Sequence, residues 1–189
     1  MAEEIQNLVE RIRQSPATIG ETRIITIDGP AGSGKTTLSH ALSGFLPECE
    51  IIHMDDLYEG WESTLTPSLS EKLLNLFTCA ADSSRISYRP YDWHKGSLRE
   101  EVEFPLPSFL ILEGVGSGQR AIRDFASFSI WIWAPKELRL ARGLERDGVE
   151  LKEEWLKFQI LEEKHFMNEE TERAADYAMS GAPSGADRP

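Results

Sequence analysis

Apolar residues recur along this chain at two different spacings, and the alternation of the two predicts the order of its secondary-structure elements. Near the start, four apolar residues fall at positions i, i+3, i+4 and i+7, the spacing of one helical face: Ile5, Leu8, Val9 and Ile12. We expect this amphipathic helix to end at Ser15, because Pro16 disfavours the helical conformation of the residue before it. Its apolar face is expected to pack onto the rest of the domain.

Short apolar runs predict the strands of a buried sheet. Residues 23–28 (RIITID) are too apolar for a strand with one exposed face, which indicates a buried, parallel strand. The runs at 108–114 (SFLILEG) and 127–134 (SFSIWIWA) have the same character. Residues 50–54 are expected to form the second strand along the chain, and 175–181 the last.

Helical patterns separate these strands. Helices are expected from Gly34 to just before Pro47, along the apolar positions Leu69, Leu73, Leu74 and Phe77, and over 119–125, 136–147 and 151–170. In the last helix, large residues are predicted to face inward: Trp155, Phe158, Ile160, Leu161 and His165. Strands that alternate with helices predict an α/β fold of three layers, a parallel sheet of about five strands with helices on both faces.

The length of the chain favours one domain over 1–181, since 189 residues suffice for one hydrophobic core and are few for two. Residues 1–15 would be a helix appended to it, and 182–189 (APSGADRP) a disordered tail. The stretch 57–104 has turn composition and mixes aromatic with charged residues. We interpret it as an insertion over the edge of the sheet.

Composition narrows the class of partner. Acidic residues outnumber basic ones by 32 to 20, and the net charge of −12 disfavours nonspecific binding to nucleic acid or to an anionic membrane. Cys49 and Cys79 lack disulfide or metal spacing, the four histidines form no zinc motif, and no apolar run reaches the roughly 18 residues of a membrane span. We therefore expect a cytoplasmic protein. An anion could bind it only where cations or N–H groups are concentrated.

Such a concentration follows the first expected strand. Residues 29–36 read GPAGSGKT, which matches GxxxxGK[ST] between a strand and a helix. Glycines permit positive φ, so that successive N–H groups can surround an anion, and the positive end of the next helix adds to the attraction. We predict a P-loop that binds a nucleoside triphosphate. Its expected phosphate-binding residues are Gly29, Ala31, Gly32, Ser33, Gly34, Lys35, Thr36 and Thr37.

Two side chains of the P-loop, and one carboxylate outside it, have expected roles in the chemistry. Lys35 would bridge the β- and γ-phosphates, and the Thr36 hydroxyl would be a ligand of Mg²⁺. Glu113 closes the strand expected beside the first one, where a carboxylate can hold Mg²⁺ directly or through water, or can merely cap the strand. A guanine-specifying NKxD sequence is absent, which disfavours a GTPase.

A pair of acids suggests what accepts the phosphoryl group. Asp55 and Asp56 follow the second expected strand, at the sheet edge where parallel α/β sheets bind ligands. On an extended chain adjacent side chains point to opposite faces, so only one would face the γ-phosphate. An alcohol loses its proton as it attacks phosphorus, and a carboxylate can accept that proton. We take Asp55 as the expected base, which favours a hydroxyl over a phosphate as the acceptor. The alternatives are a solvated turn aspartate and a remote anchor for Mg²⁺.

A stripe of arginines is the second concentration of positive charge. Arg139, Arg142 and Arg146 fall on one face of the helix expected over 136–147. Beside a P-loop, such a stripe is suited to clamp the charge of the transferring phosphoryl oxygens. We therefore interpret 139–155 as a lid. The alternative is a solvent-exposed face paired with acids such as Glu145.

Six segments in this order resemble the uridine kinase, phosphoribulokinase and pantothenate kinase family of P-loop small-molecule kinases: IDGPAGSGKTT, HMDDLY, RPYDW, LILEGV, RLARGLERD and ADYAMSG. The resemblance implies a P-loop fold, ATP and Mg²⁺ as cofactors, Asp55 as general base, Glu113 near the metal, and Arg142 and Arg146 as lid residues. It also implies an acceptor site around Tyr58, Tyr91 and Asp92, in the insertion.

The chain departs from uridine kinases near that acceptor site. Those enzymes carry an acidic sugar-binding segment soon after the base, which residues 61–72 lack, and a histidine at the position of Gly96. His94 is a candidate to take its place. The sequence therefore predicts phosphoryl transfer from ATP to a hydroxyl of a small molecule, with a nucleoside as the favoured acceptor and the oligomeric state, including a homo-oligomer, left open.

Two other functions remain open from the sequence. One is a nucleoside monophosphate kinase, in which Arg85, Arg89 or Arg99 would clamp the acceptor phosphate. The other is an ATP-binding regulatory protein that phosphorylates no small molecule.

Overall fold

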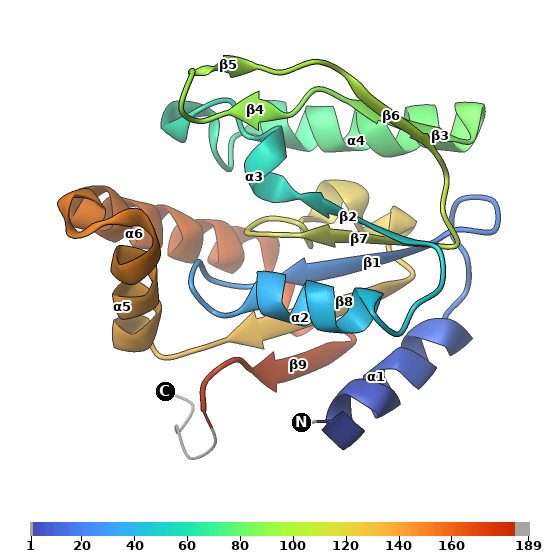
Figure 1. Cartoon of the computed structure of the whole chain (residues 1–189), viewed down its shortest axis with the longest axis horizontal. Helices are drawn as coiled ribbons and strands as arrows, with labels where there is room; N and C mark the ends of the chain where they lie inside the picture. The colour runs from blue at the N-terminus through green and yellow to red at the C-terminus, as the bar shows by residue number, and fades with distance from the viewer. Residues whose placement is uncertain (1, 184–189) are drawn as a thin grey trace.

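Five parallel strands form the centre of the computed structural model, which describes residues 2–183 (Figure 1). The strands are β1 (Arg23–Asp28), β2 (Cys49–His53), β7 (Phe109–Glu113), β8 (Phe128–Trp133) and β9 (Tyr177–Ser180). Their order across the sheet is β2-β7-β1-β8-β9, and every neighbouring pair is parallel. The predicted α/β fold and its five strands are confirmed. Of the expected tail, residues 184–189 lie outside the described part of the chain.

Helices cover both faces of this sheet. The longer ones are α1 (Ala2–Gln14), α2 (Lys35–Ser43), α4 (Pro67–Ser83), α5 (Lys136–Asp147) and α6 (Lys152–Glu169). The short ones are α3 (Met54–Leu57) and α7 (Thr171–Ala174), with 3₁₀ turns η1 (Trp61–Ser63), η2 (Arg120–Phe125) and η3 (Val149–Leu151). None of the helices within 2–183 is long and apolar enough to cross a membrane.

The alternation of side chains along β1 creates two cores. Ile25 and Ile27 point to the face covered by α1 and α2, whereas Ile24 points to the opposite face, under α4. The predicted amphipathic helix is confirmed as α1, whose four apolar residues are buried in the first core. Burial on both faces explains why these strands are apolar throughout their length.

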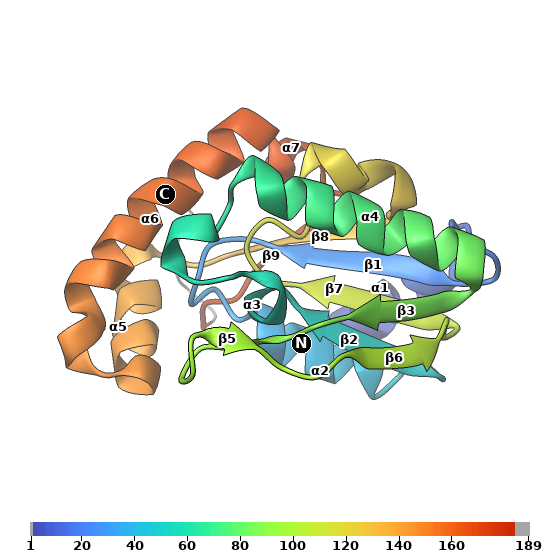
Figure 2. The same ribbon diagram turned by 90° about the horizontal axis from the view of Figure 1, so that it is seen from above.

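The insertion predicted over 57–104 has two parts: α4 covers the sheet face on which Ile24 lies, and the segment after α4 lies beyond the β2 edge (Figures 1 and 2). It contains α4 and two small antiparallel pairs: β3 (Arg85–Tyr88) with β6 (Val102–Pro105), and β4 (Tyr91–Asp92) with β5 (Ser97–Leu98). Leu69, Leu73 and Phe77 of α4 are buried as expected, but Leu74 is exposed and Leu76 takes an inward position.

Two expectations about helices are wrong. Asp55 and Asp56 do not continue the extended chain of β2, because they lie in the four-residue helix α3. In α6, Trp155 is buried, but Ile160 and Leu161 are exposed, and the buried positions on either side of this pair are the polar residues Gln159 and Glu162. The inner face of α6 is polar because it contacts the P-loop, as the next section shows.

Candidate active site

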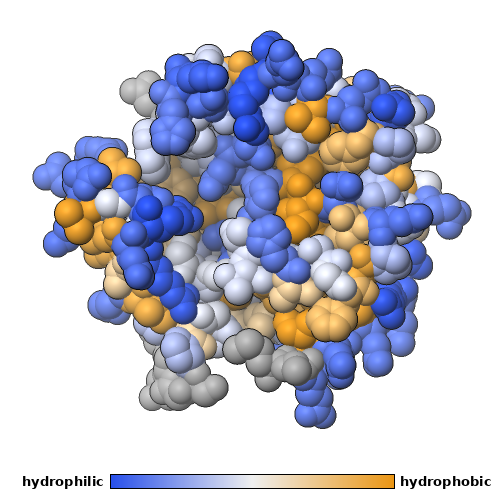
Figure 3. Space-filling view, viewed as in Figure 1, coloured by the Kyte–Doolittle hydropathy of each residue, from blue (hydrophilic) through white to orange (hydrophobic). Residues whose placement is uncertain are grey.

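The carboxyl ends of the five strands meet at one edge of the sheet, and the residues predicted from separate motifs come together there. The P-loop follows β1, α3 follows β2, and Glu113 ends β7. In the sheet register Glu113 lies between Ile27 and His53, so that it stands beside both the P-loop and α3. The space-filling view shows the surface hollowed between the α5–α6 side and the rest of the molecule (Figure 3).

The P-loop backbone needs glycine at two close approaches. Gly29 has φ 143°, and a Cβ there would lie 2.0 Å from the Ile132 carbonyl oxygen. Gly32 has φ 78°, and a Cβ there would lie 2.5 Å from the carbonyl oxygen of Arg139. Any larger residue would therefore push the loop away from β8 or from α5.

Not every amide of the P-loop faces the phosphate site. The Gly29 N–H donates to Asp28 Oδ1 (2.7 Å), the Ala31 N–H to Glu162 Oε2 (2.7 Å), and the Ser33 N–H to the Pro30 carbonyl (3.2 Å). These three amides, which are predicted to bind phosphate, have hydrogen-bond partners within the protein in this structure. The other predicted phosphate-binding amides belong to Gly32, Gly34, Lys35, Thr36 and Thr37, and the last three begin α2, where helical N–H groups lack partners in their own helix.

Lys35 is held inside the loop. Its ammonium donates to the carbonyls of Gly29 (2.7 Å) and Pro30 (2.9 Å), and the residue is only 7% exposed. Burial lowers the pKa of Lys35, whereas the carboxylates of Glu162, Asp28, Glu113 and Asp55 oppose the shift. Because the Lys35 ammonium is hydrogen-bonded to neutral carbonyl oxygens, it can exchange these partners for the oxygens of a phosphate.

Thr36, Glu113 and His53 form a chain of hydrogen bonds. The Thr36 hydroxyl donates to Glu113 Oε1 (2.9 Å), and the same oxygen lies 2.5 Å from His53 Nδ1. Burial acts to raise the pKa of Glu113, but the His53 hydrogen bond, the Lys35 charge and the Thr36 hydroxyl outweigh it and lower that pKa. The hydrogen bond to Glu113 in turn raises the pKa of His53.

Oxygen donors make this place suited to Mg²⁺. A hydroxyl and an ionised carboxylate are hard ligands, and Mg²⁺ commonly takes one or two of these together with substrate phosphates. Within residues 2–183 no three His, Cys, Asp or Glu side chains are arranged to hold a metal ion by themselves. Thr36 and Glu113 therefore fit a magnesium ion that arrives with a nucleotide.

Asp55 lies at the mouth of the site, on α3. The residue is exposed at the surface, but nearby protein groups displace part of the water around its carboxylate, and this desolvation raises its pKa, while the charge of Lys35 opposes the shift. After Lys35, the charges that affect the pKa of Asp55 most are Glu113, which raises it, and Arg146, which lowers it. The neighbouring Asp56 turns toward the insertion, where its Oδ1 lies 3.4 Å from the Arg99 guanidinium. The two side chains have different surroundings because they lie on a helix rather than on an extended chain, and Asp55 as the base stays a prediction.

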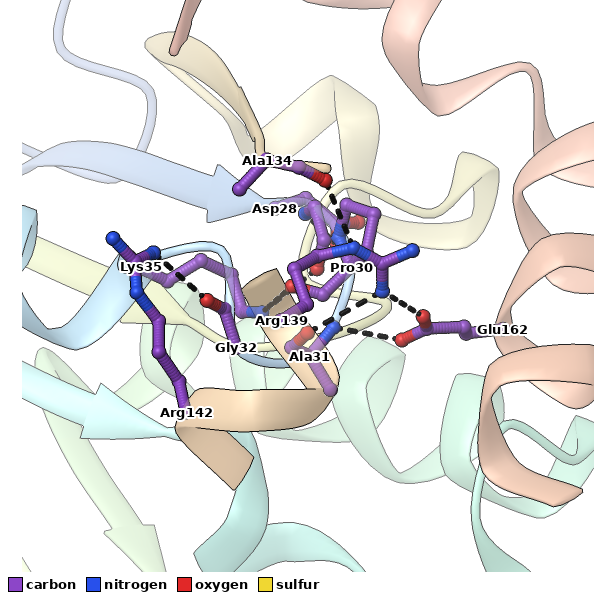
Figure 4. Close-up of polar contacts among 10 residues, drawn as sticks. Asp28, Pro30, Ala31, Gly32, Lys35, Ala134, Arg139, Arg142 and Glu162 are labelled. Carbon is purple, nitrogen blue, oxygen red and sulfur yellow. Dashed lines mark hydrogen bonds and ion pairs between the residues drawn. The ribbon is translucent and has the colours of Figure 1, made fainter. Parts of the chain in front are cut away.

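The three arginines of the predicted stripe have different surroundings. Arg139 is buried, and its guanidinium donates to Glu162 Oε1 (2.7 Å) and to the Ala134 carbonyl (3.0 Å), as Figure 4 shows. Arg142 lies on the other side of the loop, near Lys35 in Figure 4, and donates to the carbonyls of Gly32 (3.1 Å) and Gly181 (2.9 Å). Arg139 is therefore engaged by Glu162 and does not lie with Arg142 around one phosphate position.

Arg146 is the exposed member of the stripe. It pairs with Asp147 (2.6 Å), and its guanidinium lies 5.8 Å from the centre of the Trp155 ring. The hydrogen bond to Asp147 is the main cause of its raised pKa, and the carboxylates of Asp55 and Glu113 contribute. Of the two predicted lid residues, Arg142 thus touches the P-loop and Arg146 is the one that acts electrostatically on Asp55.

The predicted acceptor residues are only partly brought together. Tyr58 is buried and its hydroxyl donates to the Val115 carbonyl (2.5 Å), so it supports the site from below and has no free hydroxyl for an acceptor. Asp92 Oδ1 accepts the backbone N–H groups of His94 (3.1 Å) and Lys95 (3.0 Å), which makes it a turn residue. His94 is exposed, and Tyr91 is half-buried in β4.

Four aromatic rings form a connected cluster that reaches Asp55 through Trp93, and the sequence analysis expected only Tyr91 among them at the acceptor site. Trp93 packs edge-on against Tyr91 (ring centres 5.4 Å apart) and against Trp61 (5.3 Å), which in turn meets Phe158 of α6 (5.9 Å). The Trp93 indole N–H donates to the carbonyl of Asp55 itself (2.9 Å). We call these four residues the aromatic cluster. The mixed aromatic composition of 57–104 was the only signal in the sequence that could have suggested it.

Asp28, His53 and Glu162 are further residues at the site that the sequence analysis missed. Asp28 is 1% exposed and its carboxylate also accepts the N–H groups of Gly116 (2.9 Å) and Gly118 (2.8 Å), so it ties the P-loop to the segment after β7. Burial raises the pKa of Asp28 to about 6, against the effect of these hydrogen bonds and of the Lys35 charge.

Comparisons with known proteins point in one direction. The chain is 30% identical over 146 residues to a uridine kinase of Borrelia garinii subsp. bavariensis, and equally to one of Borreliella burgdorferi, with 66% of this chain and 67% of each relative covered. No family model matches the chain.

Solved structures agree in fold. A structure described as a "possible uridine kinase" from Bacillus stearothermophilus superposes with a TM-score of 0.72 at 21% identity, over 95% of this chain and 98% of that one. A kinase assigned to a fructose transport system in Silicibacter superposes with a TM-score of 0.60 at 21% identity, over 94% and 98%. The P-loop kinase fold is thereby established for this chain.

Proposed function

The chain belongs to the uridine kinase family, a family of phosphotransferases with a hydroxyl acceptor, and from this premise we propose that it transfers the γ-phosphoryl group of ATP, in the presence of Mg²⁺, to a hydroxyl of a nucleoside. The observation that carries the proposal is the position of Asp55. An exposed carboxylate lies at the mouth of the P-loop site, within the electrostatic reach of Lys35 and Glu113. An acceptor hydroxyl at that mouth would meet a proton acceptor and the γ-phosphate together.

The residues of the P-loop would bind and orient the nucleotide. The N-terminal amides of α2 and the Lys35 ammonium would surround the β- and γ-phosphates, and Thr36 and Glu113 would hold Mg²⁺. The bound ion would supply positive charge against the phosphate oxygens. Arg142 is already hydrogen-bonded to the loop and would add a cation from the α5 side. Together these groups neutralise charge where it develops during transfer.

Asp55 would act on the acceptor. Its raised pKa makes it a stronger base than an ordinary aspartate, while Lys35 and Arg146 oppose a complete loss of its charge. The carboxylate would take the proton of the attacking hydroxyl as the oxygen–phosphorus bond forms. The bond to the leaving ADP oxygen breaks in the same transfer.

The aromatic cluster supports a nucleoside as the acceptor. Trp61 and Trp93 are 46% and 38% exposed, so parts of both rings are open to a ligand next to Asp55. A flat aromatic surface stacks well on a nucleobase and offers less to a small polar sugar or acid. Both relatives are named uridine kinases, and uridine is a nucleoside.

The arginines that a phosphate acceptor would need are already engaged. Arg85 pairs with Glu103, Arg89 donates to the carbonyl of Arg99, and Arg99 in turn pairs with Asp56. This arrangement favours an alcohol over a nucleoside monophosphate as the acceptor. It leaves no arginine of the three without a protein partner.

Asp55→Asn tests the proposal. The substitution keeps the shape of the side chain and removes the proton acceptor, so kcat with ATP and a nucleoside should fall by roughly 10²- to 10⁴-fold. ATP affinity, measured by calorimetry in the absence of acceptor, should barely change. The matched control is Asp56→Asn, which removes the ion pair with Arg99 at the surface and should keep most of the activity.

Two outcomes would decide against parts of this mechanism. Full activity of both variants on the best acceptor would overturn the hydroxyl mechanism, because a phosphate acceptor needs no base. A loss confined to Asp56→Asn would keep the mechanism and move the base by one residue.

A further inference from the structure

A groove of about 620 Å³ lies against the P-loop on the side of Arg139 and Glu162, and neither Lys35 nor Arg142 lines it. Its walls come from the end of β8, the start of α5, the inner side of α6 and the short helix α7, and Pro30 of the P-loop forms part of it. Figure 2 shows α6 running from α5 toward α7 across these elements. The volume is in the range of small-molecule sites.

Aromatic side chains line this groove. Trp131 and Trp133 come from β8, and Phe166 of α6 packs edge-on against Trp131, with ring centres 4.7 Å apart. Such walls favour a flat, apolar ring over an extended or strongly hydrated ligand.

Two polar groups in these walls are without partners. Gln159 is 2% exposed, and neither its amide oxygen nor its amide nitrogen has a hydrogen bond in the described part of the chain. The same holds for the indole Nε1 of Trp131. An unsatisfied buried polar group costs about 1–3 kcal/mol, so a bound molecule that reaches these three atoms would recover that cost. The amide of Gln159 offers one donor and one acceptor side by side.

The charges of the groove disfavour an anionic ligand. Two of its cations are paired within it, Arg139 with Glu162 and Arg173 with Glu170. Lys136 is the remaining cation, and Glu163 and Glu172 add further negative charge. A phosphate would therefore gain little here, in contrast to the P-loop.

We propose that this groove binds an uncharged planar heterocycle that carries a hydrogen-bond donor and acceptor on one edge, as the base of a nucleoside does. Its edge would pair with the Gln159 amide, as glutamine pairs with adenine in other settings, and its face would stack on the tryptophans. The site is distinct from the nucleotide phosphates and from Asp55, and its existence does not depend on the proposed reaction.

The groove is connected to the P-loop through two of its own residues. Glu162 holds the Ala31 amide with one oxygen and Arg139 with the other, and Arg139 also reaches the Ala31 carbonyl (3.4 Å). A ligand that moves Glu162 would therefore move the P-loop. We expect occupancy of the groove to change the KM for ATP.

The five tryptophans provide a readout for each site. In a ¹⁵N-labelled protein, the indole N–H resonances can be assigned by single Trp→Phe variants. Trp131 and Trp133 report on the groove and Trp61 and Trp93 on the aromatic cluster, while Trp155, which donates to Asp147, is the internal reference. The probes are adenine, cytosine and uracil, which carry no sugar hydroxyl and cannot be phosphorylated there.

We expect at least one of these bases, titrated to about 10 mM, to shift the Trp131 and Trp133 resonances in a saturable way. Gln159→Leu should weaken that binding at least tenfold, the loss expected for an unreplaced hydrogen-bonded pair, and Trp93→Ala should leave it unchanged. Shifts confined to Trp61 and Trp93, or no shift with any base, would overturn the proposal. Unchanged binding by Gln159→Leu would do the same. The wild-type titration alone is decisive should Gln159→Leu fail to fold.

Discussion

The nucleotide side and the acceptor side of this molecule are built differently. On the nucleotide side, Asp28, Lys35 and Glu113 are all less than a tenth exposed, and each is hydrogen-bonded to a residue of the P-loop or of the start of α2. On the acceptor side, the strands β4 and β5 have two residues each, and contacts join half-exposed side chains such as Trp61 and Trp93. The residues proposed to activate the phosphate are part of the buried core, whereas the surface that would select the acceptor lies outside it.

This difference indicates which parts of the protein can be substituted without loss of the proposed phosphoryl transfer. A substitution in the insertion alters contacts among side chains at the surface, but one near the P-loop disturbs a buried network. We therefore expect variants on the nucleotide side to lower turnover with every acceptor, and variants on the acceptor side to change the preference among acceptors.

Lys35→Ala is the strongest test of the nucleotide side. The variant loses the cation nearest the phosphates, and kcat should fall by about 10³-fold or more, by a similar factor with every acceptor. Circular dichroism should show an unchanged fold, since Lys35 contacts loop carbonyls and no core side chain. Turnover near that of the wild type would contradict the assignment of the P-loop.

Arg139→Ala should reveal how strongly the P-loop depends on α6. It leaves the buried carboxylate of Glu162 without its guanidinium, and loss of one partner of a buried pair costs about 3–5 kcal/mol of unfolding free energy. Urea denaturation measures this loss. The control is Arg173→Ala, which removes an exposed pair with Glu170 and should leave the urea midpoint almost unchanged. Equal effects of the two variants would show that the buried pair is not special.

Asp28 makes the nucleotide side sensitive to pH. Its pKa of about 6 in the folded protein lies above the ordinary value of 3.8, so folding favours the protonated form. Its contribution to stability is therefore greatest below about pH 4 and decreases as the pH rises through about 6, by about 3 kcal/mol in all. The difference in unfolding free energy between the wild type and Asp28→Asn should follow this curve. Parallel pH profiles of the two proteins would contradict it.

Trp93→Ala should have the smallest effect and the most selective one. Loss of one stacking surface should raise the KM for a nucleoside roughly 10-fold and leave the KM for ATP unchanged. Phe45→Ala, which removes an exposed ring at the end of α2, is the control and should change neither constant. A rise in the KM for ATP, or none for the nucleoside, would remove the distinction between the two sides.

The sequence predicts the nucleotide side well because its signals are local. The five strands and the GxxxxGKT turn follow from short patterns, and Glu113 follows from its place at a strand end. The roles of single amides do not, because the Ala31 N–H points to a carboxylate 131 positions away, in Glu162. That long-range contact also reverses the expected face of α6, since it requires a polar inner side and leaves Ile160 outside.

The acceptor side was harder to predict for a different physical reason. Tyr58 has the residue type of a ligand contact, but burial directs its hydroxyl to a backbone carbonyl. Asp55 was placed on an extended chain, yet α3 begins one residue earlier, at Met54. Four-residue helices and two-residue strands carry too few residues to leave a periodic pattern.

The helix α1 has a consequence for the order in which this chain can fold during synthesis. Its Arg11 donates to the carbonyl of Asp176, 165 positions later, and lies against the rings of Phe128 and Tyr177. At about 5–20 residues per second, a ribosome would take roughly 8–33 s to produce that partner after α1 has been made. During this interval the apolar face of α1 has no complete sheet to cover. The first helix of the chain therefore completes its native contacts only after β9 has been made.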